Sequence, residues 1–340
     1  MTDARASFGP LTVRQGELAS TPLRDAYDLC IAVCSWETRA SAAFEQVGDV
    51  QGVWEVWSFA SGDADKAEAK AACFDRLTSV RNGPLAKIEL DGSLKYERNF
   101  ELIEDYFRSR SQAKGGPLDV LLDMTCLPKK YMLFVLGMAL RNEFVRAIDF
   151  VYSEGRYRAP VTEEVHGPMT WSRSDGDWAS VQVPYLEADN FIPDARGLIV
   201  SLGAEISASV PFIERYEPLQ IALVSVKDEA SRIDPVAIEA ERRLLRELET
   251  LPITTSVDAA LEDVLGVARL CRSFCEDQPD MAVTGLAIGS KPHALGLGLA
   301  ALAAPNLEIV CRLPSRYLSG DVVATGRTFV YAVEDRFEPR

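Results

Sequence analysis

Two loops of the sequence place hydroxyl and lysine side chains directly before an apolar, helix-like segment. The residues are Thr125, Lys129 and Lys130 in the first loop, and Ser290 and Lys291 in the second. A proline stands at the expected first turn of each helix, where its fixed φ fits, and the hydroxyl groups are suited to cap free amides. Because a helix N-terminus carries partial positive charge, an added lysine makes each loop a candidate phosphate or anion site. The alternative is two ordinary capped helices with solvated lysines.

A second set of candidates follows the first and fifth expected strands. Glu37 and Arg39, beside Trp36, have the hydrogen-bonding groups to contact a base edge or a ribose. An arginine–tyrosine pair follows the fifth strand of each half, and arginine clasps phosphate with two donors while tyrosine stacks on a base. These pairs are Arg156–Tyr157 and Arg316–Tyr317. Each pair also fits a plain structural role, as a surface arginine beside a packing tyrosine.

Motifs for hydrolysis or metal catalysis are missing from the sequence. It has no G-x-S-x-G, H-E-x-x-H or G-x-x-x-x-G-K-[ST] motif. With only two histidines, and with cysteine pairs spaced four apart, it lacks the tight cluster that a zinc site needs. We therefore expect no metal and no cofactor, assign no catalytic residue, and leave open whether the protein is an enzyme.

Composition and charge narrow the possible partners. The chain has 340 residues, with 36 Lys and Arg against 51 Asp and Glu, and a formal net charge of −15. This balance argues against binding to duplex nucleic acid or to anionic membranes, which need a dense basic face. A small anion held in a local basic site remains compatible with it. No apolar run reaches the roughly 18 residues of a membrane span. An odd number of cysteines, seven, and the absence of a secretory signal predict a cytoplasmic protein.

Short apolar runs alternate with longer amphipathic ones, a pattern typical of βαβ units and a parallel sheet. Strands are expected in the first half at 28–34, 53–60, 85–90, 119–125 and 147–153. Strands are expected in the second half at 197–202, 219–226, 253–257, 282–288 and 308–313, with a last edge strand at 328–333. In such sheets ligands bind at the carboxyl ends of the strands, which is where the candidate loops lie.

The fold class that follows is α/β, with two tandem Rossmann-like, three-layer domains on mainly parallel sheets. The expected division is an N-terminal domain at 1–158, a β-hairpin or linker at 159–195, and a C-terminal domain at 196–340. The halves also align with each other, since C34-S-W-E-T-R-A-S-A-A-F matches L202-G-A-E-I-S-A-S-V-P-F. We interpret this match as an internal duplication. The alternative is the general likeness of any two doubly wound domains.

The strand-four segment of the first half resembles a known family. L-L-D-M-T-C-L-P-K-K-Y-M, an apolar helix and D-F-V-Y-S together resemble the motif of CARF domains, which are Rossmann-like sensors of cyclic oligonucleotides in prokaryotic antiviral defence. Leu127 and Pro128 stand where that motif has glycines, and the second copy, A-I-G-S-K-P-H-A-L, lacks the Asp and Thr. A duplicated chain also resembles SAVED proteins, which look like two fused CARF-like halves. The resemblance implies that the hydroxyl and lysine residues of both loops contact ligand phosphates.

Two classes of function remain. The resemblance favours a sensor that binds a cyclic nucleotide or similar small anionic second messenger in a cleft between two Rossmann-like halves. Such a sensor would signal to an effector protein, or through self-assembly as a homo-oligomer. The alternative is an enzyme that acts on a nucleotide or another phosphorylated small molecule in the same cleft, with turnover that depends on Glu37, Asp123 or Lys130.

Overall fold

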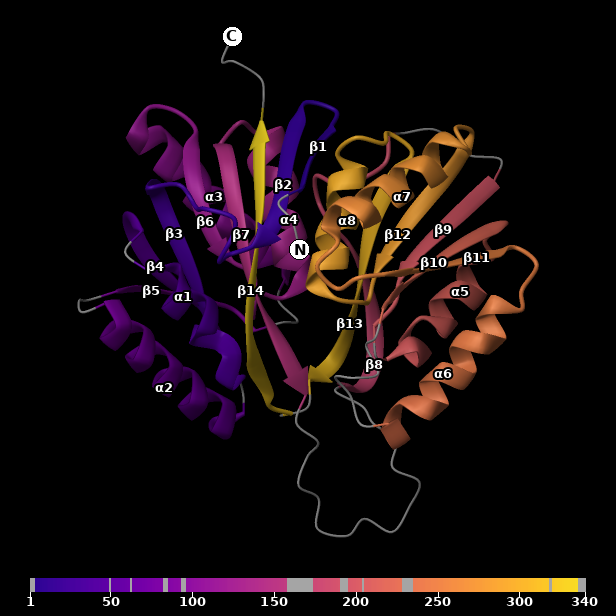
Figure 1. The fold of residues 1–340 in the computed structure, drawn as a ribbon, viewed down its shortest axis with the longest axis horizontal. Coiled ribbons are helices and arrows are strands. Elements are labelled where there is room, and N and C mark those ends of the chain that lie inside the picture. The colour runs from indigo at the N-terminus through magenta and orange to yellow at the C-terminus, as the bar shows by residue number, and fades with distance from the viewer. Residues whose placement is uncertain are drawn as a thin grey trace. The chain divides into compact units, whose positions relative to one another are not determined.

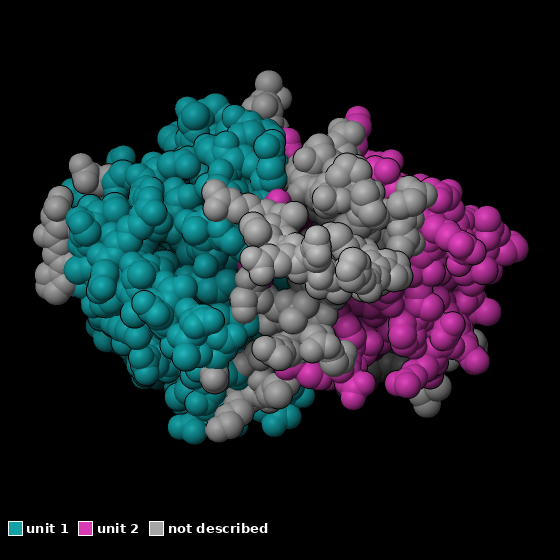
Figure 2. Space-filling model, turned by 90° about the horizontal axis from the view of Figure 1, so that it is seen from below, with its two compact units in different colours: residues 1–156, 321–340 teal, residues 157–320 magenta. Residues whose placement is uncertain are grey.

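The computed structural model of the chain describes residues 4–48, 50–61, 63–81, 85–92, 96–157, 174–189, 195–203, 205–227, 235–317 and 320–335. The chain forms two compact units, coloured separately in Figure 2. Unit 1 consists of residues 1–156 and 321–340, and unit 2 of residues 157–320. Both are α/β folds built on a mainly parallel sheet.

Unit 1 is built on a sheet with the strand order β1-β2-β14-β7-β6-β3-β4-β5 (Figure 1). Its strands are β1 (Ala4–Phe8), β2 (Leu11–Glu17), β3 (Ala26–Cys34), β4 (Gln51–Phe59), β5 (Ala86–Leu90), β6 (Leu118–Asp123), β7 (Val145–Tyr157) and β14 (Val322–Asp335). The five strands from β5 to β7 in this order run parallel. Strand β2 pairs antiparallel with both β1 and β14.

Helices cover both faces of this sheet. They are η1 (Thr38–Ser41), α1 (Ala42–Val47), α2 (Ala64–Arg81), α3 (Tyr96–Lys114) and α4 (Lys129–Arg141). Successive residues of a strand point to opposite faces, so Val56 packs with Leu77 of α2 on one face. Trp57 meets Phe107 of α3 on the other face, with the ring centroids 6.3 Å apart. Helix α4 packs beside α3, which gives unit 1 three layers.

Unit 2 repeats the order of the parallel strands. Its sheet runs β11-β10-β9-β12-β13-β8, with β8 antiparallel to β13. The strands are β8 (Ser174–Gln182), β9 (Ala195–Ser201), β10 (Gln220–Val226), β11 (Thr254–Ala259), β12 (Met281–Ala287) and β13 (Leu307–Tyr317). The helices are η2 (Ile206–Ala208), α5 (Val210–Tyr216), α6 (Pro235–Glu249), α7 (Val264–Glu276) and α8 (Lys291–Ala301). The shared order fits a duplication, which stays a prediction.

The two helices that follow the lysine-bearing loops are buried, as their sequences predict. Every residue of α4 from Lys130 to Leu140 is buried, and so is every residue of α8 from Pro292 to Ala301. A helix that is apolar on nearly all faces packs inside a domain or a membrane. Within the described residues, no helix is long and apolar enough to cross a membrane.

The expected C-terminal domain at 196–340 and the expected linker at 159–195 differ from the structure. The expected edge strand at 328–333 belongs to β14, which lies between β2 and β7 inside the sheet of unit 1. Both of its faces are buried, since Phe329, Val330 and Tyr331 are each 0% exposed. Residues 321–340 therefore belong to unit 1, not to a domain at 196–340. Within the expected β-hairpin or linker at 159–195, residues 174–182 form strand β8 of unit 2, and 159–173 and 190–194 lie outside the described residues.

We predict that a chain ending at residue 320 loses the cooperative unfolding of unit 1. Without β14, strands β2 and β7 lose their shared neighbour, and the apolar side chains that pack against Phe329 and Tyr331 become exposed. Tryptophan fluorescence in a urea titration measures this, because Trp36, Trp54 and Trp57 lie in unit 1. An unfolding transition identical to that of the full chain would contradict the interior position of β14.

Candidate functional site

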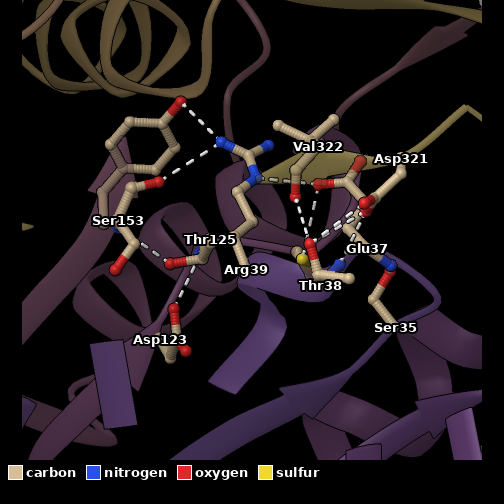
Figure 3. Close-up of polar contacts among 11 residues, drawn as sticks. Ser35, Glu37, Thr38, Arg39, Asp123, Thr125, Ser153, Asp321 and Val322 are labelled. Atoms are coloured by element: carbon tan, nitrogen blue, oxygen red, sulfur yellow. Dashed lines mark hydrogen bonds and ion pairs between the residues drawn. The ribbon is translucent and has the colours of Figure 1, made fainter. Parts of the chain in front are cut away.

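Several polar side chains of unit 1, among them the sequence candidates Glu37, Arg39 and Thr125, gather at the carboxyl edge of its parallel strands. Residues Ser35, Glu37, Thr38 and Arg39 follow β3, while Asp123 and Thr125 end and follow β6 (Figure 3). Strand β14 begins at the same place, so that Asp321 and Val322 lie beside this cluster. The structure thus brings the loops that follow β3 and β6 together with a segment from the far end of the chain.

Arg39 is buried and acts as a brace inside this cluster. Its Nε donates to Glu37 Oε2 at 2.8 Å, and its terminal nitrogen donates to the Tyr152 hydroxyl at 3.3 Å and the Ser153 carbonyl at 3.2 Å. The sequence left Glu37 and Arg39 open as base or ribose contacts. In the structure they are hydrogen-bonded to each other and tie the loop after β3 to β7.

Thr38 and Asp321 join the loop after β3 to the start of β14. The Thr38 amide donates to Asp321 Oδ1 at 2.9 Å, and its hydroxyl lies 3.0 and 3.1 Å from the two carboxylate oxygens. The Thr38 hydroxyl is also 3.3 Å from the Val322 carbonyl. These contacts link residues more than 280 positions apart and hold the loop after β3 against the start of β14.

The expected capping role of Thr125 is wrong. Residue Pro128, not Thr125, stands at the N-cap position of α4, and it makes no side-chain cap hydrogen bond. The Thr125 hydroxyl accepts the Ser153 amide at 2.9 Å, and its own amide donates to Asp123 Oδ1 at 2.8 Å. Since Thr125 is 0% exposed, its hydroxyl joins β6 to β7 and is not presented to a ligand from solvent.

The two lysines of the first loop differ in burial. Lys129 is half-buried at the first position of α4, whereas Lys130 is 0% exposed. The Lys130 ammonium lies 4.9 Å from the centroid of the Tyr131 ring and 5.3 Å from that of Tyr96. Such cation–π contacts are worth about 2 kcal/mol when desolvated. Lys130 is therefore not the solvated lysine of the alternative interpretation.

Two further lysines that sequence reasoning missed lie at the same edge. Lys66 and Lys70, in the first two turns of α2, are both buried and both face the Trp36 ring. Their ammonium nitrogens lie 4.8 and 5.6 Å from its centroid. The Lys70 ammonium also donates to the Phe59 carbonyl at the end of β4, and the Phe59 ring stacks on Tyr131 at 4.8 Å. We call Lys66, Lys70 and the Trp36 ring the lysine site. Through Phe59 it is connected to Tyr131, the ring beside Lys130.

Lys70 differs from Lys66 in its charged neighbours. Burial, and then the like charge of Lys66, lower the pKa of Lys70 below its usual value. Lys66 has a carboxylate nearby, Asp63, at 3.6 Å. Among the described residues, no carboxylate forms an ion pair with Lys70, whose contacts are a carbonyl and an aromatic ring. An anion placed here would meet two ammonium groups at once.

The helix pattern held a signal for these lysines. Cys73, Phe74 and Leu77 form the apolar stripe of α2 against the sheet. Extended toward the N-terminus at the helical spacing, the stripe reaches positions 70 and 66. A lysine at a position of the apolar stripe is predicted to be buried, as Lys66 and Lys70 are.

The candidates of unit 2 lie at the carboxyl edge of its own sheet. Ser290 is the N-cap of α8 and accepts the His293 amide at 3.2 Å, as expected, while Lys291 is half-buried at the first helical position. Residues 316 and 317 continue β13 opposite Asp175 and Ser174.

The other arginine–tyrosine pair lies at the end of β7, a strand of the unit 1 sheet. There, Arg156 is exposed and Tyr157 is half-buried. Within the described residues, no group of three metal-ligating side chains occurs.

Comparisons with known proteins do not place the chain in a family. No family model matches it, and no curated protein matches it. A solved structure named as a universal stress protein from Pseudomonas aeruginosa UCBPP-PA14 covers 84% of this chain and 92% of its own. The two share 11% identity at a TM-score of 0.24.

We predict that Gly155→Ala destabilises unit 1 by about 1–3 kcal/mol. A Cβ there would lie 2.4 Å from Val322 Cγ1 and 2.6 Å from a terminal nitrogen of Arg39, so the brace must move. Urea unfolding measures the loss. Gly116→Ala is the matched control, because nothing lies within 4 Å of its Cβ position. Equal stabilities of the two variants would contradict the tight packing of Arg39 against β7.

Proposed function

We propose that the chain is a sensor that binds a small anionic ligand of the nucleotide class at the carboxyl edge of the unit 1 sheet. It would pass the signal to an effector protein or through self-assembly, as the resemblance to CARF domains implies for prokaryotic antiviral defence. The observation that carries the proposal is the lysine site, where Lys66 and Lys70 face one indole ring.

The buried charge of Lys70 destabilises the folded chain when no anion is bound. Removing an ammonium group from water costs several kcal/mol in real proteins. For Lys70, the contacts with the Trp36 ring and the Phe59 carbonyl offset only part of that cost, and its lowered pKa reflects the remainder. A bound anion offsets it directly, because both ammonium groups gain an opposite charge in a site of low dielectric.

The residue types favour a nucleotide over a bare inorganic anion. Lysine binds phosphate as a point charge, and an indole ring offers a surface on which bases stack. Trp36 stands directly before the Glu37–Arg39 brace, which fixes the loop that carries it. Lys130 adds a third buried cation at the same sheet edge. In unit 2, Ser290 and Lys291 form the corresponding candidate at α8.

We predict that a nucleotide raises the melting temperature of the chain and that Lys70→Met abolishes most of the shift. The probes are inorganic phosphate, pyrophosphate, ATP, and cyclic mono-, di- and trinucleotides. A ligand at 100 times its Kd stabilises the folded state by about 2.7 kcal/mol. Losing one charged hydrogen bond costs about 1.5–3 kcal/mol, which is a roughly ten- to hundredfold weaker Kd.

The control is Lys87→Met, since Lys87 is an exposed lysine of unit 1 paired with Glu89. Without ligand, Lys70→Met melts at or above the temperature of the parent chain, because it removes a buried ammonium. Lys291→Ala tests whether unit 2 contributes. A shift that is unchanged in Lys70→Met would refute the lysine site, and product formation from the bound nucleotide would favour the enzyme alternative.

A further inference from the structure

Unit 2 contains a buried arginine near one edge of its sheet. Arg312 of β13 is 9% exposed and stands directly opposite Ser180 of the edge strand β8. Side chains two residues apart on a strand share a face, and Val310 on that face belongs to the apolar core cluster against which Trp178 packs. The guanidinium of Arg312 therefore lies on the face where the sheet packs its apolar side chains.

The hydrogen bonds of Arg312 use one of its three side-chain nitrogens. Nη1 donates to the Trp178 carbonyl at 3.1 Å and to the Ser180 hydroxyl at 3.0 Å. The guanidinium carbon lies 6.0 Å from the centroid of the Trp178 ring. Nε is buried and has no hydrogen-bond acceptor, and Nη2 donates to no atom of the described residues. These contacts hold the guanidinium at Nη1 and leave its other edge, formed by Nε and Nη2, without an acceptor from the described chain.

Arg39 of unit 1 shows how this chain pairs another buried arginine. Arg39 is 5% exposed, and its Nε donates to the Glu37 carboxylate at 2.8 Å. Among the residues that the structure describes, no carboxylate forms an ion pair with Arg312. Glu308, which lies on the same face of β13, accepts hydrogen bonds from two other side chains. The charge of Arg39 is thus balanced by a neighbouring side chain, whereas the described residues do not balance that of Arg312.

A buried guanidinium without an opposite charge destabilises the folded chain. Removing the cation from water is unfavourable unless an anion and a full set of hydrogen bonds compensate for it, and a buried N–H without an acceptor adds to the loss. Burial, followed by the like charge of Arg215, lowers the pKa of Arg312, in agreement with this cost. An oxyanion would remove both defects, because it supplies the opposite charge and accepts from Nε and Nη2.

We propose that Arg312 forms an anion site in unit 2, whose Nε–Nη2 edge binds the carboxylate or phosphate group of a small molecule. This edge carries two parallel N–H donors, which match two oxygens of such a group in a bidentate contact. The Trp178 carbonyl and the Ser180 hydroxyl hold Nη1 and so fix the plane of the guanidinium. Ser180 is exposed and Trp178 is half-buried, so a small molecule approaches the guanidinium beside β8.

The anion site is separate from the lysine site of the proposed function. Its residues lie on β8 and β13 of unit 2, whereas Lys70 and Trp36 belong to unit 1. The two proposals therefore fail independently. In a Lys70→Met chain the lysine site has lost one of its two ammonium groups, and binding that depends on Arg312 remains.

The experiment titrates the full Lys70→Met chain with inorganic phosphate, pyrophosphate, acetate or malonate in a calorimeter, in a buffer free of other oxyanions. The phosphates and the carboxylates are two arms that show which group the site prefers. We expect one-to-one binding of at least one probe, and Arg312→Met weakens its Kd by roughly ten- to hundredfold, because a charged hydrogen bond is lost. The control is Arg243→Met, an exposed arginine of unit 2 paired with Glu247, which leaves the Kd unchanged.

A second variant tests the bidentate contact. Arg312→Lys keeps the positive charge and loses the paired donors, so it binds the probe more weakly than the parent chain. Equal Kd values for Arg312→Met and Arg243→Met would overturn the proposal, and so would the absence of binding by every probe at millimolar concentration. If the Arg312 variants fail to fold, a crystal structure of the unmutated chain with the tightest probe decides. An anion within hydrogen-bond distance of Nε and Nη2 supports the site, and an anion bound only elsewhere refutes it.

Discussion

The sheet of unit 1 depends on the pairing of its last strand, β14, between β2 and β7. This strand arrives after the 164 residues of unit 2 (157–320), so unit 1 is complete only when both ends of the chain have met. Its first residues fix the loop after β3 through Asp321 and Thr38. Further along it, Thr328 reaches Ser153 at 2.9 Å. The pairing of β14 with β2 and β7 therefore completes the core of unit 1 and also holds the loop after β3 in place.

The second constraint is the burial of positive charge in an acidic chain. Three lysine side chains of unit 1 are at least nine-tenths buried, and aromatic rings face each of them. Desolvated cation–π contacts return about 2 kcal/mol, less than the several kcal/mol that desolvating an ammonium group costs. Groups that reduce stability in this way concentrate at functional sites. The buried lysines beside Trp36, and not a sequence motif, distinguish this edge of the sheet.

Much of the fold follows from periodicity alone. Each strand that the sequence predicts is present in the structure. Periodicity does not say which strands become neighbours. The run Phe329–Val333 is apolar at every position, which suits an interior strand, but only the sheet order shows that it joins unit 1. The hairpin of β1 and β2 was missed because its polar residues weaken the pattern.

The strand-four loop shows why a motif is not a site. Its residue types suggest capping and phosphate contact, yet the Thr125 hydroxyl accepts an amide of β7 and the Lys130 ammonium lies between two tyrosine rings. Both groups are fully buried. The polar residues of this loop therefore join β6, β7 and α4 into one body. The lysines that we propose for the ligand lie on α2, where both ammonium groups face the Trp36 ring. In the proposed function, an anion at α2 would lie against a part of unit 1 that the contacts of the strand-four loop hold together.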